Sequence, residues 1–265
     1  MLLVSALYIY PVKSLGGIPV DSATVTDRGL EYDRRWLLID NQGIQITQRE
    51  VPAMALLQPA ITEKGLQITH RPTNAQLLIP YNPFTNDFTE VQCWDDTVRA
   101  QFVDPAADAW FAEVLKINCR LVYMPDDTRR QTDLNYTEKG HFTSFADGYP
   151  FLLIGEASLD ELNSRLDEPI PMNRFRPNIV FSGGVPFEED NLHQFTIAAI
   201  RFNGVKLCAR CVMTTIDQLT AEKGKEPLRT LAGYRRDGHK ILFGQNLIHH
   251  GAGRIAVGDQ LVPIQ

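Results

Sequence analysis

Short runs of apolar and β-branched residues, separated by turn residues, dominate the first 100 positions. Each run has the length and composition of a strand, and Asn41-Gln42-Gly43 is typical of a hairpin turn. The candidate strands cover residues 4–10, 23–26, 36–40, 44–47, 54–57, 66–70, 76–79 and 98–102. Many short strands with frequent turns favour a barrel or sandwich over a doubly wound sheet.

Helical periodicity is confined to a few segments. Helices are expected near Asp104, Ser158 and Pro227, where a cap residue or a proline precedes apolar residues at helical spacing. At Ser158, a glutamate three residues later completes a capping-box pattern. The apolar runs 151–154 and 179–181 are candidates for buried strands. The pattern therefore predicts a β-rich α+β protein with a few short helices.

The polar segment 124–140 separates two β-rich halves of the chain. It is long for a loop within one compact domain, so it is predicted to be a functional loop or a connection between modules. We expect one β module over residues 1–120 and a second over 121–265. Neither half contains an internal repeat or a low-complexity tract.

Composition and charge exclude several classes of protein. The 265 residues are 44% hydrophobic and 22% charged, as in ordinary folded domains. A formal net charge of -6 disfavours a nucleic-acid partner or an anionic membrane surface. The N-terminus lacks the basic flank and cleavage site of a signal peptide, and no run approaches the ~20 apolar residues of a membrane span. A cytoplasmic protein with reduced thiols is expected, because four dispersed cysteines do not make a disulfide scaffold.

Cys208 and Cys211 form a C-x-x-C pair with several possible meanings. Two buried structural cysteines at a strand end are one interpretation. A zinc site would need four ligands, and His249 and His250 are adjacent and point apart on a strand. A thioredoxin-type motif would open a helix, whereas residues 212–216 look strand-like. A single-thiolate metal site fits better, because an adjacent arginine favours the thiolate.

Three polar residues, Arg174, Arg176 and Asn178, precede the buried-strand candidate at 179–181. A solvated arginine pair at a strand start is the ordinary alternative. Strand alternation would place all three on one face, where guanidinium groups can bind an anion.

These motifs resemble the MOSC family, named for the C-terminal domain of molybdenum-cofactor sulfurases. The pattern Arg210-Cys211 followed by Thr214-Thr215 matches the superfamily, as does Arg176-Pro177-Asn178. The N-terminal Pro11-Val12-Lys13-Ser14 is similar to the branch that contains the mitochondrial amidoxime-reducing component and its bacterial relatives. The resemblance extends over nearly the whole chain and implies a MOSC-type β-barrel preceded by an N-terminal β-barrel-like module.

The resemblance implies a molybdenum cofactor with Cys211 as the metal ligand, while Cys208 would be structural. Asp147 matches a family residue and is expected to act catalytically as a proton relay at the metal, although a turn-forming role is an alternative. The residues expected to hold the cofactor are Lys13, Ser14, Arg34, Gly148, Tyr149, Arg176, Asn178, Ala209, Arg210 and Asn246.

Some of these positions depart from the family pattern. Gly148 and Tyr149 stand where hydroxyl residues are usual, and Ala209 replaces a serine. Asn246 stands where a tyrosine is found in some relatives. Backbone N–H groups are expected to replace side-chain contacts at Gly148, Tyr149 and Ala209.

The resemblance implies an oxidoreductase that reduces N-hydroxylated compounds, such as amidoximes, hydroxylamines or N-hydroxylated bases. The cysteines lack the spacing of an iron–sulfur cluster. Electrons are therefore expected from a separate flavoprotein or from an iron–sulfur or haem carrier.

Two other functions remain open. One is a sulfur carrier or sulfurtransferase with a persulfide on Cys211. Pyridoxal-phosphate chemistry in such a protein would need a Schiff base at Lys13, and the chain shows no recognisable domain for that cofactor. The other is a non-catalytic carrier that stores or delivers the molybdenum cofactor.

Overall fold

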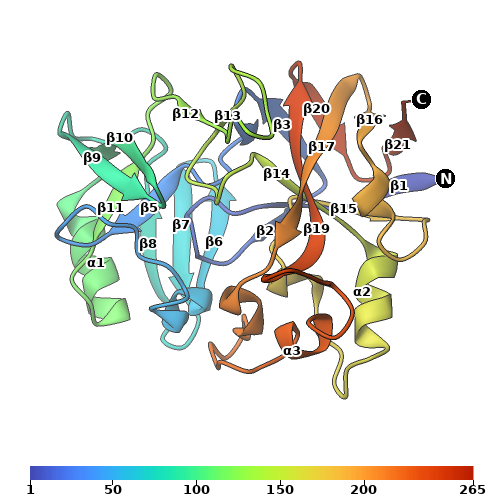
Figure 1. Ribbon diagram of the computed structural model, residues 1–265. Helices are drawn as coiled ribbons and strands as arrows, with labels where there is room; N and C mark the ends of the chain where they lie inside the picture. Colours follow the sequence, from blue (N-terminus) through green and yellow to red (C-terminus); the bar gives the residue numbers. More distant parts are fainter. Residues whose placement is uncertain (265) are drawn as a thin grey trace.

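A closed barrel of seven strands forms the right-hand part of the computed structural model, which describes residues 1–264 (Figure 1). In barrel order the strands are β14 (Phe151–Gly155), β15 (Ile179–Ser182), β1 (Leu2–Ile9), β21 (Gln260–Pro263), β16 (Gln194–Ile197), β17 (Ile200–Ala209) and β19 (Lys240–His250), which pairs back onto β14. The predicted β-rich α+β class and MOSC-type barrel are confirmed.

Aromatic and aliphatic side chains fill the interior of this barrel. Phe151 packs edge-on against Phe202, which stacks on Phe195 at 5.7 Å between ring centroids. All three are essentially inaccessible to solvent, so their burial is a main source of barrel stability. Because β1 lies between β15 and β21, the start of the chain completes the barrel formed by its C-terminal half.

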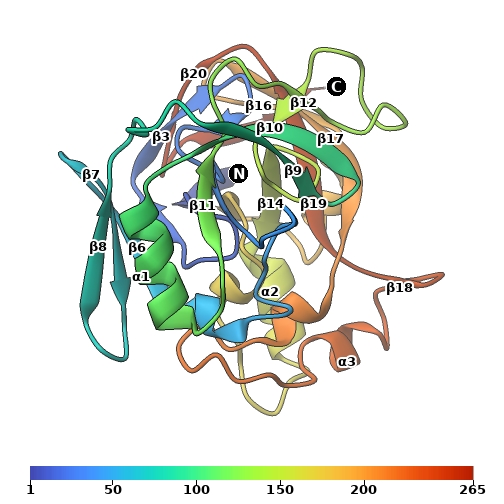
Figure 2. The same ribbon diagram turned by 90° about the vertical axis from the view of Figure 1, so that its left-hand side faces the viewer.

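The N-terminal half forms a second β layer beside the barrel (Figure 2). A four-stranded sheet has the order β5 (Trp36–Ile39), β11 (Arg120–Tyr123), β10 (Asp96–Phe102) and β9 (Phe88–Cys93). A three-stranded sheet is formed by β6 (Leu57–Thr62), β7 (Gly65–His70) and β8 (Ala75–Ile79). Helix α1 (Pro105–Leu115) packs its buried Phe111 into the core between them.

The remaining elements are short. The strands are β2 (Ile18–Val20), β3 (Ser22–Thr26), β4 (Gly29–Leu30), β12 (Arg130–Gln131), β13 (Phe142–Thr143), β18 (Arg236–Asp237) and β20 (Gly253–Ala256). The helices are α2 (Glu156–Asn163) and α3 (Leu228–Leu231), with 3-10 turns at Pro52–Leu56, Met172–Arg174, Glu188–Asn191 and Val212–Thr215. Strand β3 pairs with β20, so a second N-terminal strand contacts the C-terminal half.

Three predicted strands are wrong. Residues 44–47 form only two isolated bridges, from Ile44 to Gln92 and from Gln45 to Ile39. Residues 54–57 belong mostly to a 3-10 helix that begins at Pro52, because proline favours the first helical position. Residues 212–215 also form a 3-10 helix: the hydroxyls of Thr214 and Thr215 donate to the carbonyl oxygens of Cys211 and Val212. These local bonds offset the strand preference of β-branched residues.

The predicted capping box at Ser158 is also wrong. Helix α2 begins at Glu156, with Gly155 as its cap. The Ser158 hydroxyl instead donates to the buried carboxylate of Glu189 at 2.7 Å. The Ser158 hydroxyl therefore makes a tertiary contact instead of the helix cap that the local pattern predicted.

The division at residue 120 stays a prediction. The polar segment 124–140 contains only the short strand β12, and Arg130 within it donates from its buried guanidinium to Asp96 at 2.7 Å. Within residues 1–264, no helix has both the length and the apolar content needed to cross a bilayer.

Candidate functional site

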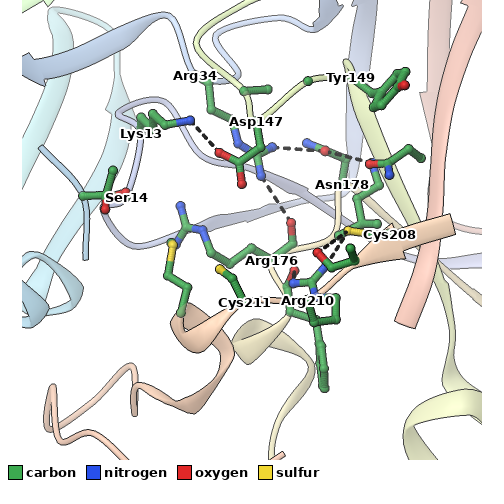
Figure 3. Close-up of a pocket in the computed structure, with 18 of the residues that line it drawn as sticks. Lys13, Ser14, Arg34, Asp147, Tyr149, Arg176, Asn178, Cys208, Arg210 and Cys211 are labelled. Carbon is green, nitrogen blue, oxygen red and sulfur yellow. Dashed lines mark hydrogen bonds and ion pairs between the residues drawn. The ribbon is translucent and has the colours of Figure 1, made fainter. Parts of the chain in front are cut away.

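All twelve predicted site residues line one open pocket between the barrel and the N-terminal sheets (Figure 3). They come from six separate segments of the chain, and the close-up shows charged groups and the Cys208 and Cys211 thiols around a shared space. The twelve are Lys13, Ser14, Arg34, Asp147, Gly148, Tyr149, Arg176, Asn178, Ala209, Arg210, Cys211 and Asn246. Their assembly is a finding, whereas their roles stay predictions.

Cys211 lies just beyond the end of β17, at the pocket wall. Its thiol is exposed, whereas Cys93 and Cys119 are buried and Cys208 is half-buried. The backbone is extended at Cys211 and then tightens into the 3-10 helix that starts at Val212. This sharp change of direction presents the thiol to the cavity.

Arg210 is held on both sides of this loop. Its backbone N–H donates to the carbonyl of Ile241 on β19 at 2.7 Å. Its guanidinium donates to the Cys208 sulfur at 3.0 Å and to the Phe175 carbonyl at 2.7 Å. Cys208 therefore serves as an acceptor for Arg210.

The alternation predicted for Arg174, Arg176 and Asn178 is wrong, although all three line the pocket. Arg174 ends a 3-10 helix, Arg176 has a left-handed backbone with φ of 58°, and β15 starts only at Ile179. The left-handed residue redirects the chain before the strand begins, so a turn instead of a strand face brings the three together.

Arg176 is a buried cation at the base of the pocket. Its guanidinium donates to the carbonyl of Leu15 at 2.7 Å and lies 4.3 Å from the centroid of the Tyr10 ring. The guanidinium of Arg34 lies at the same distance from that ring. Burial lowers the pKa of Arg176 to about 10, so an anion in the pocket would relieve an unfavourable charge.

Arg34 is oriented by buried acceptors. It donates to the Asp33 carboxylate at 2.6 Å and to the Asn178 side-chain oxygen at 3.0 Å. Asp33 also accepts from the backbone N–H of Tyr10 at 2.8 Å. Burial raises the pKa of Asp33, against the lowering effect of Arg34. This network ties the N-terminal segment to the start of β15.

Lys13 and Asp147 form an ion pair from opposite halves of the chain. The buried Lys13 ammonium donates to Asp147 at 2.6 Å and to the Phe145 carbonyl at 2.7 Å. The indole N–H of Trp94 adds a third contact, to Asp147 at 3.1 Å. Although enclosure in the pocket opposes ionisation, Lys13 and then Trp94 hold the pKa of Asp147 well below its usual range. The carboxylate remains 70% accessible to solvent.

Two comparisons relate the chain to known proteins. Residues 1–118 match the MOSC N-terminal beta barrel domain and residues 141–262 match the MOSC domain. The mitochondrial amidoxime-reducing component 1 of Mus musculus is 35% identical over 97% of this chain and 80% of its own length. The chain belongs to the MOSC family.

Other MOSC relatives extend the comparison. The mitochondrial amidoxime-reducing component 1 of Homo sapiens is 34% identical over 97% of this chain and 81% of its own length. The molybdenum cofactor sulfurase of Oryza sativa subsp. japonica is 33% identical over 97% of this chain and 35% of its own length. The mitochondrial location named for the first two is theirs, and a cytoplasmic location for this MOSC protein stays a prediction.

Four pocket positions depart from the MOSC pattern: Gly148, Tyr149, Ala209 and Asn246. Only Tyr149 among them has a side-chain hydroxyl. Gly148 borders open space, since a Cβ there would meet no atom within 4 Å. The Tyr149 hydroxyl is buried without a hydrogen-bond partner among residues 1–264. Asn246 donates to the carbonyl of Lys206 at 3.1 Å. At Gly148 the backbone is thus open to the cavity.

Sequence reasoning missed Thr47, Arg49 and Met213, which also line the pocket of this MOSC protein. Thr47 ends the run 44–47 and Arg49 follows it, and neither residue belongs to a local motif. Only the packing of that segment against the C-terminal half brings them to the site. With Arg174 and Arg49 included, five arginines and one lysine line the pocket against a single carboxylate. An acidic protein therefore concentrates positive charge at this one site.

The residues present fit a molybdenum cofactor in their donor chemistry. An exposed thiol suits a soft metal, and the guanidinium groups suit an anionic pterin phosphate. The Arg210 Nε atom is buried and has no acceptor in the described part of the chain, residues 1–264. A buried donor without a partner is unfavourable, and an anionic ligand in the pocket would supply the missing acceptor.

Proposed function

We propose that this MOSC protein binds a molybdenum cofactor through Cys211 and reduces N-hydroxylated compounds with electrons from a separate donor protein. The relatives named amidoxime-reducing components support the reaction class. The observation that carries the proposal is an exposed thiol facing a pocket lined by six cationic side chains. Such a pocket combines a metal ligand with the means to hold an anion.

A single protein ligand is consistent with the surroundings of Cys211. Among residues 1–264, no three His, Cys, Asp or Glu side chains gather into a metal-binding cluster. The remaining positions on a metal at Cys211 would therefore be filled from the cofactor or from solvent. This arrangement leaves room for a substrate oxygen atom.

The cofactor's anionic groups would be held by Arg176, Arg34 and Arg210. The first two are fixed by the Tyr10 ring and by buried acceptors, so little side-chain freedom is lost on binding. Ser14 and Asn178 offer further polar atoms at the pocket wall. Backbone N–H groups at Gly148, Tyr149 and Ala209 would replace the serine and threonine hydroxyl contacts of the family pattern.

When bound, the cofactor supplies the two-electron chemistry that converts an N–OH group into N–H. The balance is R–NHOH + 2 e⁻ + 2 H⁺ → R–NH₂ + H₂O, so the protein also has to provide protons. The Asp147 carboxylate is ionised and accepts hydrogen bonds, which suits it to orient the N–OH proton or a water molecule. The ammonium of Lys13 is the adjacent proton-bearing group, 2.6 Å from Asp147.

Electrons would come from a second protein. Of the four cysteines in this sequence only Cys208 and Cys211 are close together, which is not the spacing of an iron–sulfur cluster. We therefore propose a flavoprotein or an iron–sulfur or haem carrier as the donor. Turnover that requires an added donor protein would support this assignment, and turnover with a nicotinamide cofactor alone would contradict it.

The decisive experiment is elemental analysis of protein made in a host that synthesises the cofactor. Native protein should contain close to one molybdenum per chain, and Cys211→Ala should lose the metal and the reductase activity while keeping its fold. Cys208→Ser is the matched control, since it removes the other pocket thiol and should keep the metal. Equal molybdenum in native protein and Cys211→Ala would rule out the ligand assignment.

The same preparations separate the two alternatives. Cyanide-labile sulfur on Cys211 without molybdenum would favour a sulfur carrier, the chemistry suggested by the relative named molybdenum cofactor sulfurase. Stoichiometric molybdenum without reduction of any N-hydroxylated compound would favour a cofactor carrier.

A further inference from the structure

Trp94 occupies a backbone position that disfavours it. It is the first of the two residues that join β9 to β10, because Cys93 pairs directly with Asp96. Its φ is 59°, in the left-handed region, whereas Asp95 is not among the residues with positive φ. A two-residue hairpin loop with positive φ at its first position strongly prefers glycine. A bulky aromatic residue there is a genuine conformational outlier.

Burial in an apolar core does not compensate for this strain. Trp94 is 38% exposed. It belongs to none of the apolar core clusters formed by residues 1–264. Its neighbour Cys93, by contrast, belongs to such a core. The side chain therefore owes its position to something other than hydrophobic packing.

The partners of Trp94 are charged residues of the candidate site. The indole N–H donates to Asp147 at 3.1 Å. The Arg49 guanidinium lies 4.1 Å from the centroid of the ring, and the Lys13 ammonium lies 5.8 Å from it. Asp147, Arg49 and Lys13 all line the pocket. One strained residue thus contacts three pocket side chains.

The turn itself is anchored to the loop that carries Asp147. Arg130 donates to Asp96 at 2.7 Å and also to the carbonyl of Ser144 at 3.0 Å. The tip of the β9–β10 hairpin and residues 144–147 are therefore held as one unit. Strain of this kind persists where surrounding contacts determine it, and it concentrates at functional sites.

We propose that Trp94 is a positioning residue of the pocket: its indole N–H fixes the Asp147 carboxylate, and its ring holds Arg49 at the pocket wall. The inference rests on the proposed function for its effect on turnover. It assigns to the N-terminal sheet a direct part in shaping the site. The indole contact itself is independent of any cofactor.

The first test reads the contact in protein without cofactor. The chain has three tryptophans, so the indole N–H region of a ¹H–¹⁵N spectrum contains three signals, and Trp94→Phe identifies the one from Trp94. Asp147→Ala should move that signal and leave those of Trp36 and Trp110 in place. An unmoved Trp94 signal would overturn the proposal, whatever the activity of the protein.

The second test separates positioning from structural support. With molybdenum content matched to native protein, Trp94→Phe should lower kcat about tenfold and change KM less than twofold. Trp94→Gly should lower kcat at least as much without lowering Tm, because glycine relieves the backbone strain. Asn74→Gly, at a left-handed residue in the turn between β7 and β8, is the matched control and should leave kcat unchanged.

The outcomes distinguish this proposal from the proposed function. A kcat of Trp94→Phe within twofold of native, or a loss of Tm that parallels the loss of activity, would overturn the positioning role. Native protein that carries molybdenum but reduces no N-hydroxylated probe, such as benzamidoxime, would contradict the proposed function. In that case the positioning role would be overturned if the indole signal did not respond to Asp147→Ala.

Discussion

Replacing Asp33 by alanine should destabilise the protein and loosen the candidate site together. The carboxylate is almost fully buried and accepts from the Tyr10 N–H at 2.8 Å and from Arg34 at 2.6 Å. Asp33→Ala would leave a buried N–H and a largely buried guanidinium without this acceptor. Because Arg34 sits between Asp33 and Asn178, its orientation toward the pocket depends on the same contact.

The contacts that Arg34 keeps determine how much Asp33→Ala destabilises the protein. Removing one partner of a buried ion pair costs about 3–5 kcal/mol. Arg34 would keep its contacts to Asn178 at 3.0 Å and to the Arg176 carbonyl at 3.2 Å, and it borders an open pocket. We therefore expect the lower end, about 3 kcal/mol, for the loss in free energy of unfolding.

Urea denaturation of four proteins would measure this coupling: native, Asp33→Ala, Arg34→Met and the double variant. The losses in free energy of unfolding for Asp33→Ala and Arg34→Met should sum to about 2 kcal/mol more than the loss for the double variant, because each single change removes the same interaction. Asp167→Ala, at an exposed residue, is the control and should change the free energy by less than about 0.5 kcal/mol. A loss below about 1 kcal/mol for Asp33→Ala, or additive single changes, would refute the reasoning.

Two further changes test the barrel. Burial raises the pKa of Glu189 from a reference of 4.5 to about 7. The protonated carboxyl therefore stabilises the fold fully below about pH 4.5, and up to about 3 kcal/mol of this stabilisation is lost as the pH rises through 7. Glu189→Gln should flatten the fall in unfolding free energy between pH 4.5 and 8, and an unchanged slope in urea titrations would contradict this. Gly204→Ala should lower the free energy of unfolding by about 1–3 kcal/mol, because the added Cβ would clash with the Leu192 carbonyl oxygen. An unchanged Tm in thermal unfolding would contradict this and show that the bulge in β17 can shift to accept the methyl group.

Local patterns in the sequence were sufficient for most regular elements. The runs 66–70 and 76–79 are strands β7 and β8, and the helix expected after Asp104 is α1, capped by the Asp104 side chain. These elements depend on residue alternation and on a cap within a few positions, which a single sequence displays directly. The errors at 54–57 and 212–216 arose where a proline or threonine hydroxyls tightened the backbone locally.

The candidate site was predicted residue by residue from family motifs, and the pocket brings all twelve together. One part of the predicted site geometry was nevertheless wrong. Arg174, Arg176 and Asn178 meet because Arg176 adopts a left-handed backbone, not because they alternate on a strand. Their roles toward a cofactor stay predictions.

The sequence by itself determined the β-rich class and the family and singled out Cys211 as the candidate metal ligand, because each depends on patterns within short stretches of residues. Only the tertiary structure decided that Arg49 lines the pocket, that Trp94 contacts Asp147, and that Lys13 pairs with Asp147, 134 positions away. It also placed β1 within the C-terminal barrel. These relations depend on strand pairing and packing between distant segments, and no local periodicity encodes them.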